Sequence, residues 1–150
     1  MEEMIEKGFI LSFDELRILL HSLGVRTVEG VYMPEKEFTD SEVIKALHHL
    51  AKSGLILSAG ERFLIREDLR EVLEAISRPE SSFIWRNESE GGQEYYCYVV
   101  PGRVAVSERY WKKSDTIKLR LFTVEEFEAW KEQAEDDNGG DRNPYDGEIV

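Results

Sequence analysis

The fold is decided by residues 94–108, which read Glu94-Tyr-Tyr-Cys-Tyr-Val-Val-Pro-Gly-Arg-Val-Ala-Val-Ser-Glu108. Aromatic and β-branched residues dominate both halves of this stretch, and these residue types favour β-strands. The Pro101-Gly102 pair between the halves is typical of a tight turn. Because a connection this short cannot cross over a sheet, the two strands are expected to run antiparallel.

The same pattern continues on both sides of this hairpin. Residues 82–86 read Ser-Phe-Ile-Trp-Arg, and residues 116–122 read Thr-Ile-Lys-Leu-Arg-Leu-Phe. Turn-forming segments, Glu90-Gly-Gly and Lys113-Ser-Asp, separate them from the central pair. The sequence therefore predicts an antiparallel meander of about four strands.

Three capping boxes mark the starts of helices around this meander. In a capping box a Ser or Thr side chain and a Glu three residues later satisfy each other's backbone N–H groups. The motif occurs as Ser12-Phe-Asp-Glu15, Thr39-Asp-Ser-Glu42 and Thr123-Val-Glu-Glu126. Apolar residues at helical spacing follow each box, and we expect helices that end near Gly24, near Gly54 and at about Ala134.

The remaining segments complete an α+β plan. Residues 55–65 form two short apolar runs around a Ser-Ala-Gly turn, which favours a small hairpin, and residues 67–77 predict a helix that Pro79 ends. Residues 25–38 fit a loop or a short extended segment. We expect an α+β domain over residues 1–134, with N-terminal helices, the hairpin, the meander and a C-terminal helix. Residues 135–150 are expected to be an acidic, disordered tail.

The composition narrows the classes of function. The 150 residues carry 31 acidic and 19 basic side chains, for a net charge of −12, and one cysteine, Cys97. This charge makes nucleic acid an unlikely partner. A lone cysteine fits a reducing compartment, and the acidic N-terminus and short apolar runs favour neither export nor membrane insertion. We expect a cytoplasmic protein.

The sequence contains no recognisable active site. Cys97 alternates with Tyr95 and Val99 in a predicted strand, which favours a packed thiol over a nucleophile. His21, His48 and His49 fall on predicted helices, where the adjacent pair points in different directions and cannot chelate one ion. No glycine-rich phosphate loop follows a strand. We expect no catalytic residues, no metal site and no cofactor.

Two features point to binding. The order of helix, turn, helix and hairpin in residues 12–65 resembles a winged-helix domain, although residues 40–53 offer only two firmly basic side chains for DNA. Farther on, basic and aromatic residues gather in the second half of the chain, and Lys118 and Arg120 line one face of a predicted strand. The predicted partner-binding residues are Tyr96, Tyr98, Arg103, Arg109, Tyr110, Trp111, Lys118 and Arg120.

Three segments carry a resemblance to a known family. They read Val43-Ile-Lys-Ala-Leu-His-His-Leu-Ala-Lys-Ser-Gly-Leu-Ile, then Glu67-Asp-Leu-Arg-Glu-Val-Leu-Glu-Ala-Ile-Ser-Arg-Pro-Glu, then Arg103-Val-Ala-Val-Ser. In this order they resemble the EspG family, cytosolic chaperones of type VII (ESX) secretion. The resemblance spans about residues 10–125 and rests on packing patterns.

The resemblance implies a chaperone or adaptor that binds a helical-hairpin secretion substrate of the WXG type and keeps it soluble. Family members are nearly twice as long, with two pseudo-symmetric halves, so this chain corresponds to one half. Either it acts alone or two copies pair, as a homodimer, to replace the missing half. The alternative function is that of an acidic winged-helix transcriptional regulator or accessory protein.

Overall fold

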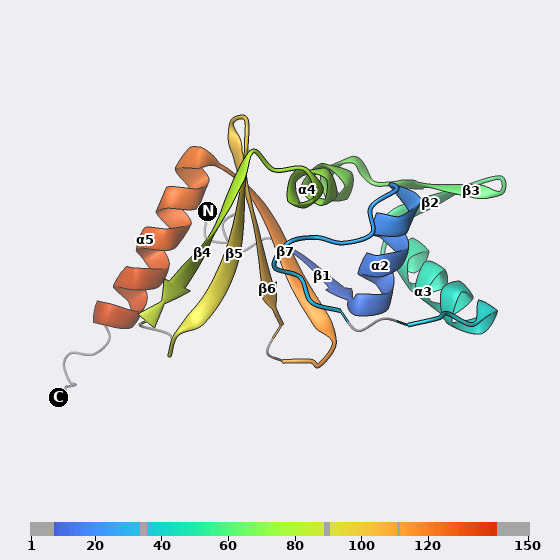
Figure 1. Cartoon of the computed structure of the whole chain (residues 1–150), viewed down its shortest axis with the longest axis horizontal. Helices are drawn as coiled ribbons and strands as arrows, with labels where there is room; N and C mark the ends of the chain where they lie inside the picture. Colours follow the sequence, from blue (N-terminus) through green and yellow to red (C-terminus); the bar gives the residue numbers. More distant parts are fainter. Residues whose placement is uncertain (1–7, 34–35, 89–90, 111, 141–150) are drawn as a thin grey trace.

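The computed structural model describes residues 8–33, 36–88, 91–110 and 112–140. Two antiparallel sheets and four helices make up this part of the chain, which confirms the α+β class (Figure 1). In chain order the elements are β1 (Phe9–Ser12), α2 (Phe13–Ser22), α3 (Asp40–Lys52), β2 (Ile56–Ala59), β3 (Arg62–Ile65), α4 (Glu67–Ser77), β4 (Ser81–Asn87), β5 (Gln93–Val100), β6 (Arg103–Arg109), β7 (Thr116–Thr123) and α5 (Val124–Gly140).

The main sheet has five strands in the order β1-β7-β6-β5-β4, and every neighbouring pair is antiparallel. The four strands β4 to β7 are the predicted meander. The fifth strand, β1, was not predicted, and it pairs with β7 so that Phe9 lies opposite Leu119. The sheet therefore joins the two ends of the described chain.

All three predicted capping boxes are present. Glu15 N donates to Ser12 Oγ and Ser12 N donates to Glu15 Oε1, at 3.1 and 3.0 Å. Equivalent reciprocal bonds join Thr39 with Glu42, and Thr123 with Glu126. Ser12 is both the last residue of β1 and the N-cap of α2, so no linker separates this strand from its helix.

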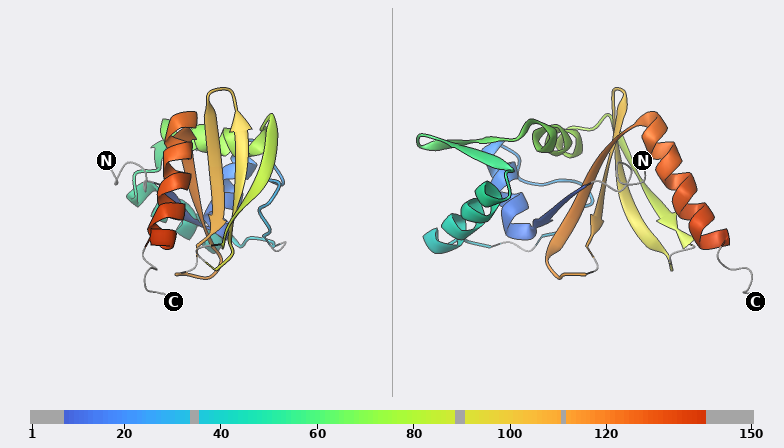
Figure 2. Two further views of the ribbon diagram at one scale, coloured as in Figure 1. Left: turned by 90° about the vertical axis from the view of Figure 1, so that its left-hand side faces the viewer. Right: turned by 180° about the vertical axis from the view of Figure 1, so that it is seen from behind.

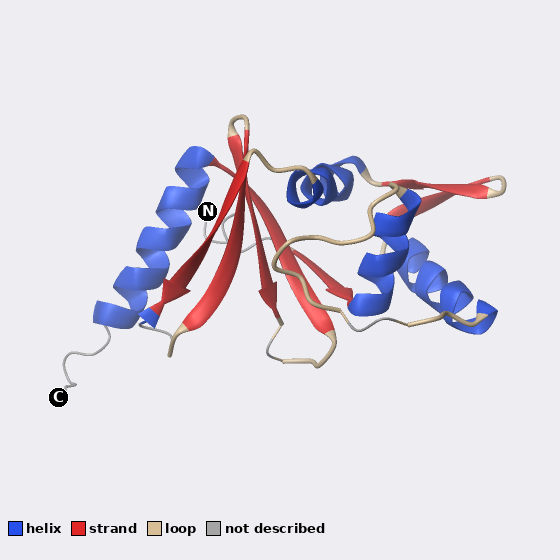
Figure 3. Cartoon of the chain, in the orientation of Figure 1, coloured by secondary structure: helices blue, strands red, loops and turns tan. Residues whose placement is uncertain are grey.

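Helices cover both faces of the main sheet (Figures 2 and 3). On one face, α5 packs through Phe127 and Trp130 onto a cluster that includes Tyr95, Cys97 and Phe122. On the other face, α2 and α4 supply leucines to the larger cluster, which contains Leu16, Leu20, Leu69, Leu73, Tyr98 and Leu119. The sheet is thus an inner layer with a core on each side.

Helix α3 and the β2–β3 hairpin lie at the end of the molecule farthest from α5 (Figure 1). Ala46 and Leu50 of α3 are buried, and α3 packs against α2 and β2. The hairpin predicted for residues 55–65 is present, and it pairs Leu57 with Leu64. We call α3 and this hairpin the projecting unit.

The C-terminal helix is longer than predicted. It continues to Gly140, six residues past Ala134, so the first part of the predicted tail is helical. Residues 141–150 lie outside the described residues. Among the helices that are described, none is long and apolar enough to cross a lipid bilayer.

Candidate functional site: a groove under the loop after α2

The loop between α2 and α3 is fastened to the main sheet at Gly30. This residue has a φ of +83°, and an added Cβ would lie 2.2 Å from the ring of Tyr96. Only glycine accepts both the positive φ and such a close ring. Two side chains of the sheet then hold the neighbouring Glu29, because Tyr98 Oη donates to its carbonyl oxygen at 2.6 Å and Ser82 Oγ donates to its Oε1 at 3.2 Å.

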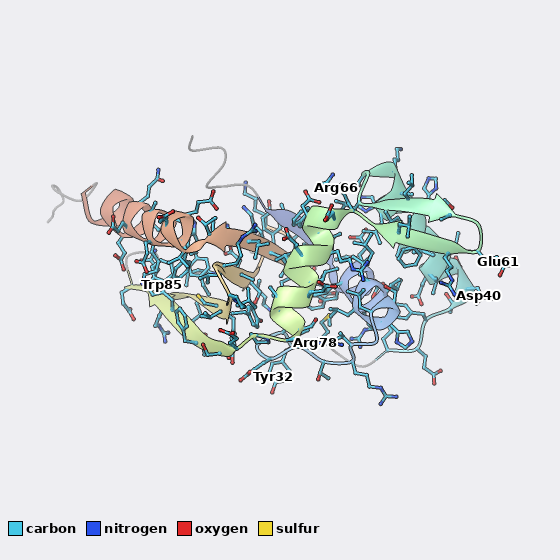
Figure 4. The ribbon with its side chains drawn as sticks, turned by 90° about the horizontal axis from the view of Figure 1, so that it is seen from above. Tyr32, Asp40, Glu61, Arg66, Arg78 and Trp85 are labelled. Carbon is cyan, nitrogen blue, oxygen red and sulfur yellow. The ribbon has the colours of Figure 1, made fainter. Side chains whose placement is uncertain are left out.

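A groove of about 470 Å³ opens beside this loop, at the end of the sheet where β5 begins and β6 ends. We call it the loop groove. Tyr32, with 88% of its surface exposed, lines it together with exposed Ile84 from β4. The full lining is Phe13, Gly30, Val31, Tyr32, Ile84, Gly91, Gly92, Gln93, Glu94, Tyr95, Tyr96, Ser107, Glu108, Arg109 and Ile117. In Figure 4, Tyr32 lies at the edge of the molecule, away from Asp40 and Glu61 of the projecting unit.

Charged groups of both signs lie along the loop groove. The Arg109 guanidinium is 5.3 Å from the ring centre of Phe13, where the cation meets the electron-rich ring face. Glu94 accepts a hydrogen bond from Arg86 at 3.3 Å. Desolvation and, next, the nearby Glu29 carboxylate raise the pKa of Tyr96, so this phenol is neutral near pH 7. The groove therefore offers aromatic surface with a polar rim.

Two of the eight predicted binding residues, Tyr96 and Arg109, line the loop groove. The prediction that Tyr98 and Arg120 belong to an accessible surface is wrong, because both are buried. Tyr98 lies beneath the loop, where burial raises the pKa of its phenol and its Oη lies 3.1 Å from Ser107 Oγ. Arg120 lies beneath α5.

The burial of Arg120 corrects the expectation that β7 has an open polar face. Its guanidinium donates to the Glu108 carboxylate from the neighbouring strand, and both side chains are less than 10% exposed. The same guanidinium lies 5.0 Å from the ring centre of Trp130 on α5. Lys118 and Arg120 do share one face, as the alternation predicted, but α5 covers that face at Arg120.

The other predicted residues are dispersed. Arg103 lies at the opposite end of β6 from Arg109, and its Nη1 is 3.8 Å from a carboxylate oxygen of Glu71 in α4. Lys118 and Tyr110 are half-buried, and Trp111 lies outside the described residues. The seven of these residues that the structure describes therefore do not form one patch.

Two of the candidate chemical groups, Cys97 and His49, are held by burial or by a hydrogen bond. Burial raises the pKa of the Cys97 thiol to about 12, which makes its thiolate scarce at neutral pH. His49 hydrogen-bonds through Nδ1 to the buried carboxylate of Glu15. Among the described residues, no three His, Cys, Asp or Glu side chains are grouped so as to hold a metal ion.

Sequence reasoning missed several residues that build the loop groove. Gly30 and Tyr32 lie in residues 25–38, for which the sequence predicts only a loop or a short extended segment, and Ile84 lies in a predicted strand but is not among the predicted binding residues. Within Val28-Glu-Gly-Val-Tyr32, Gly30 is the one sequence feature that could indicate this turn. Val28 and Val31 form a β-bridge on either side of it.

Comparisons with protein-family models and with curated proteins found no match to this chain. The resemblance to EspG chaperones therefore stands on the sequence segments alone.

Proposed function

We propose that this protein is a non-enzymatic adaptor, similar in role to the EspG chaperones, which binds a helical secreted partner of a type VII secretion system in the cytoplasm. The observation that carries the proposal is the loop groove, with Tyr32 projecting beside Ile84 and Tyr96. A helical partner of this kind places apolar side chains on one face, at spacings of three and four residues. These side chains would enter the groove.

The composition of the groove supports a protein partner. Tyrosine and arginine are enriched among the residues that dominate binding energy at protein interfaces, and Tyr32, Tyr96 and Arg109 all line this groove. Because the loop is fastened at Gly30 and Glu29, the aromatic surface is held in place before binding. A preformed surface loses less conformational entropy when it binds.

The alternative, a winged-helix regulator, would place α3 and the hairpin against DNA. The outward face of this hairpin carries Leu57 and Leu64, which are 68% and 58% exposed, and Asp40 begins α3. Leucines and an acidic residue are poor neighbours for phosphates, whereas Lys45 and Lys52 are suitable ones. This balance favours a protein partner over DNA.

The proposal is tested by co-expressing the chain with each WXG-type helical-hairpin protein of the organism it comes from. We expect one of them to form a complex of defined mass in light scattering. In titration calorimetry, Tyr32→Glu and Arg109→Glu should each raise the dissociation constant by about tenfold or more, since each removes an interface contact. The matched control is Ile44→Glu, an exposed apolar residue on α3 outside the groove.

Absence of binding to any hairpin protein would overturn the proposal. Loss of binding in Ile44→Glu but not in Tyr32→Glu would place the partner on the projecting unit instead. Binding to random-sequence duplex DNA with a strong salt dependence, reduced by Lys45→Glu, would favour the regulator.

A further inference from the structure

The main sheet has one long open edge, formed by β4. Phe83 and Ile84 are consecutive, so their side chains point to opposite faces of the sheet, yet they are 41% and 56% exposed. When two consecutive strand residues are both this exposed, solvent reaches both faces of the strand. The opposite edge, β1, has four residues against seven in β4. Edge strands of this length and character are templates for pairing with another strand.

Symmetry restricts how β4 could pair with β4 of a second copy. An antiparallel pair related by a two-fold axis perpendicular to the sheet places one residue opposite itself, because paired residues direct their side chains to the same face of the sheet. The axis can therefore pass at Phe83 or at Ile84 in the exposed middle of the strand. An axis at Ile84 places Glu80 opposite Glu88 of the second copy, which is repulsive.

An axis at Phe83 produces complementary charges. It places Glu80 opposite Arg86 of the second copy, and the same contact occurs twice. Both side chains are exposed in the single chain, where Arg86 forms ion pairs with two exposed carboxylates, those of Glu88 and Glu94, at 3.4 and 3.3 Å. In this register Phe83 also meets Phe83 of the second copy, an aromatic cross-strand pair of a kind that stabilises sheets.

We propose that two copies of this chain pair through β4, antiparallel and centred on Phe83, to form a continuous ten-stranded sheet. A two-fold axis perpendicular to the sheet keeps α5 of both copies on one face. The two loop grooves then lie one toward each end of the paired β4 strands. The proposal rests on β4 and does not depend on what the groove binds.

The test measures the mass of the purified full chain by light scattering as its concentration is raised. The chain has a mass of 17.4 kDa, and we expect twice this mass in the micromolar range. Glu80→Arg and Arg86→Glu should each weaken dimerisation by about tenfold or more, since each turns two attractive contacts into two repulsive ones. Arg70→Glu is the matched control, because Arg70 is an equally exposed arginine that pairs with Glu74 on α4.

Mixing the two charge variants is the decisive measurement. One copy with arginine at both positions and one with glutamate at both positions complement each other, so the equimolar mixture should recover a heterodimer. The double variant Glu80→Arg/Arg86→Glu should recover the homodimer. A monomeric wild-type chain would overturn the proposal, as would a dimer unaffected by both single changes or a mixture that stays monomeric. Intact circular dichroism spectra of the single variants exclude misfolding as the cause.

Discussion

The two faces of the main sheet are covered in different ways. One helix, α5, covers the first face, and aromatic rings fill the space beneath it, with Trp130 5.0 Å from Tyr95 between ring centres. Two helices, α2 and α4, and the loop at Gly30 cover the second face, where leucines predominate. A single helix leaves much of a sheet face uncovered, and the large aromatic side chains beneath α5 cover part of the remaining area. The comparison shows that ring size can compensate for a missing second helix.

The largest effect is expected in the aromatic cluster beneath α5. Trp130→Ala removes the ring that contacts Trp85, Tyr95 and Phe122. Since α5 is the one helix on this face in the described part of the chain, we expect a loss of about 3–5 kcal/mol in the free energy of unfolding. Urea denaturation followed by circular dichroism measures this loss. Val124→Ala, at an exposed position of the same helix, should change little, and an equal loss there would contradict the explanation.

A smaller effect is expected at the ion pair beneath α5. Arg120→Met leaves the Glu108 carboxylate buried without its guanidinium partner, although Gln93 Nε2 still donates to it at 3.3 Å, and should cost about 3 kcal/mol. Because an apolar pair of similar volume replaces a buried ion pair well, Arg120→Met/Glu108→Leu should recover most of this loss. Urea denaturation of both variants provides the comparison. A double variant as unstable as the single one would show that the loss comes from packing.

The smallest expected effect concerns the opposite face. Tyr98→Phe deletes the hydroxyl that holds the carbonyl of Glu29, and a lost buried hydrogen bond costs about 1–2 kcal/mol. The loop should also open more often, so the Val31 amide, which donates to Val28, should exchange its hydrogen faster in deuterated water. Tyr32→Phe is the control, since its ring is exposed. Unchanged exchange in Tyr98→Phe would show that Gly30 packing and the Ser82–Glu29 hydrogen bond hold the loop without the Tyr98 hydroxyl.

Local signals predicted most of the fold. The capping boxes at Ser12, Thr39 and Thr123 each consist of four adjacent residues, so the sequence contains the whole interaction. The turns of the meander are equally local. Strand β1 was missed because its four residues form a strand only through β7, whose pairing residues lie more than a hundred positions later. The sequence around Phe9 does not indicate that this segment pairs with β7.

The candidate site was harder to predict for a related reason. Alternation along β7 correctly placed Lys118 and Arg120 on one face, but alternation does not report what covers a face. An arginine paired beneath a helix and an arginine in solvent look the same in a sequence. The loop groove depends on a loop folding back onto Tyr96, and only Gly30 hinted at this contact.

The pairing of β1 with β7 also affects the order in which the chain can fold during synthesis. The ribosome makes β1 long before β7, so β1 must wait without its partner while the helices and the meander emerge. Contacts between such distant segments slow folding, because the intervening chain must first be brought together. The β1–β7 ladder therefore cannot close until β7, the last strand of the sheet, has been made, and the apolar residues Phe9, Ile10 and Leu11 stay without their partner strand until then.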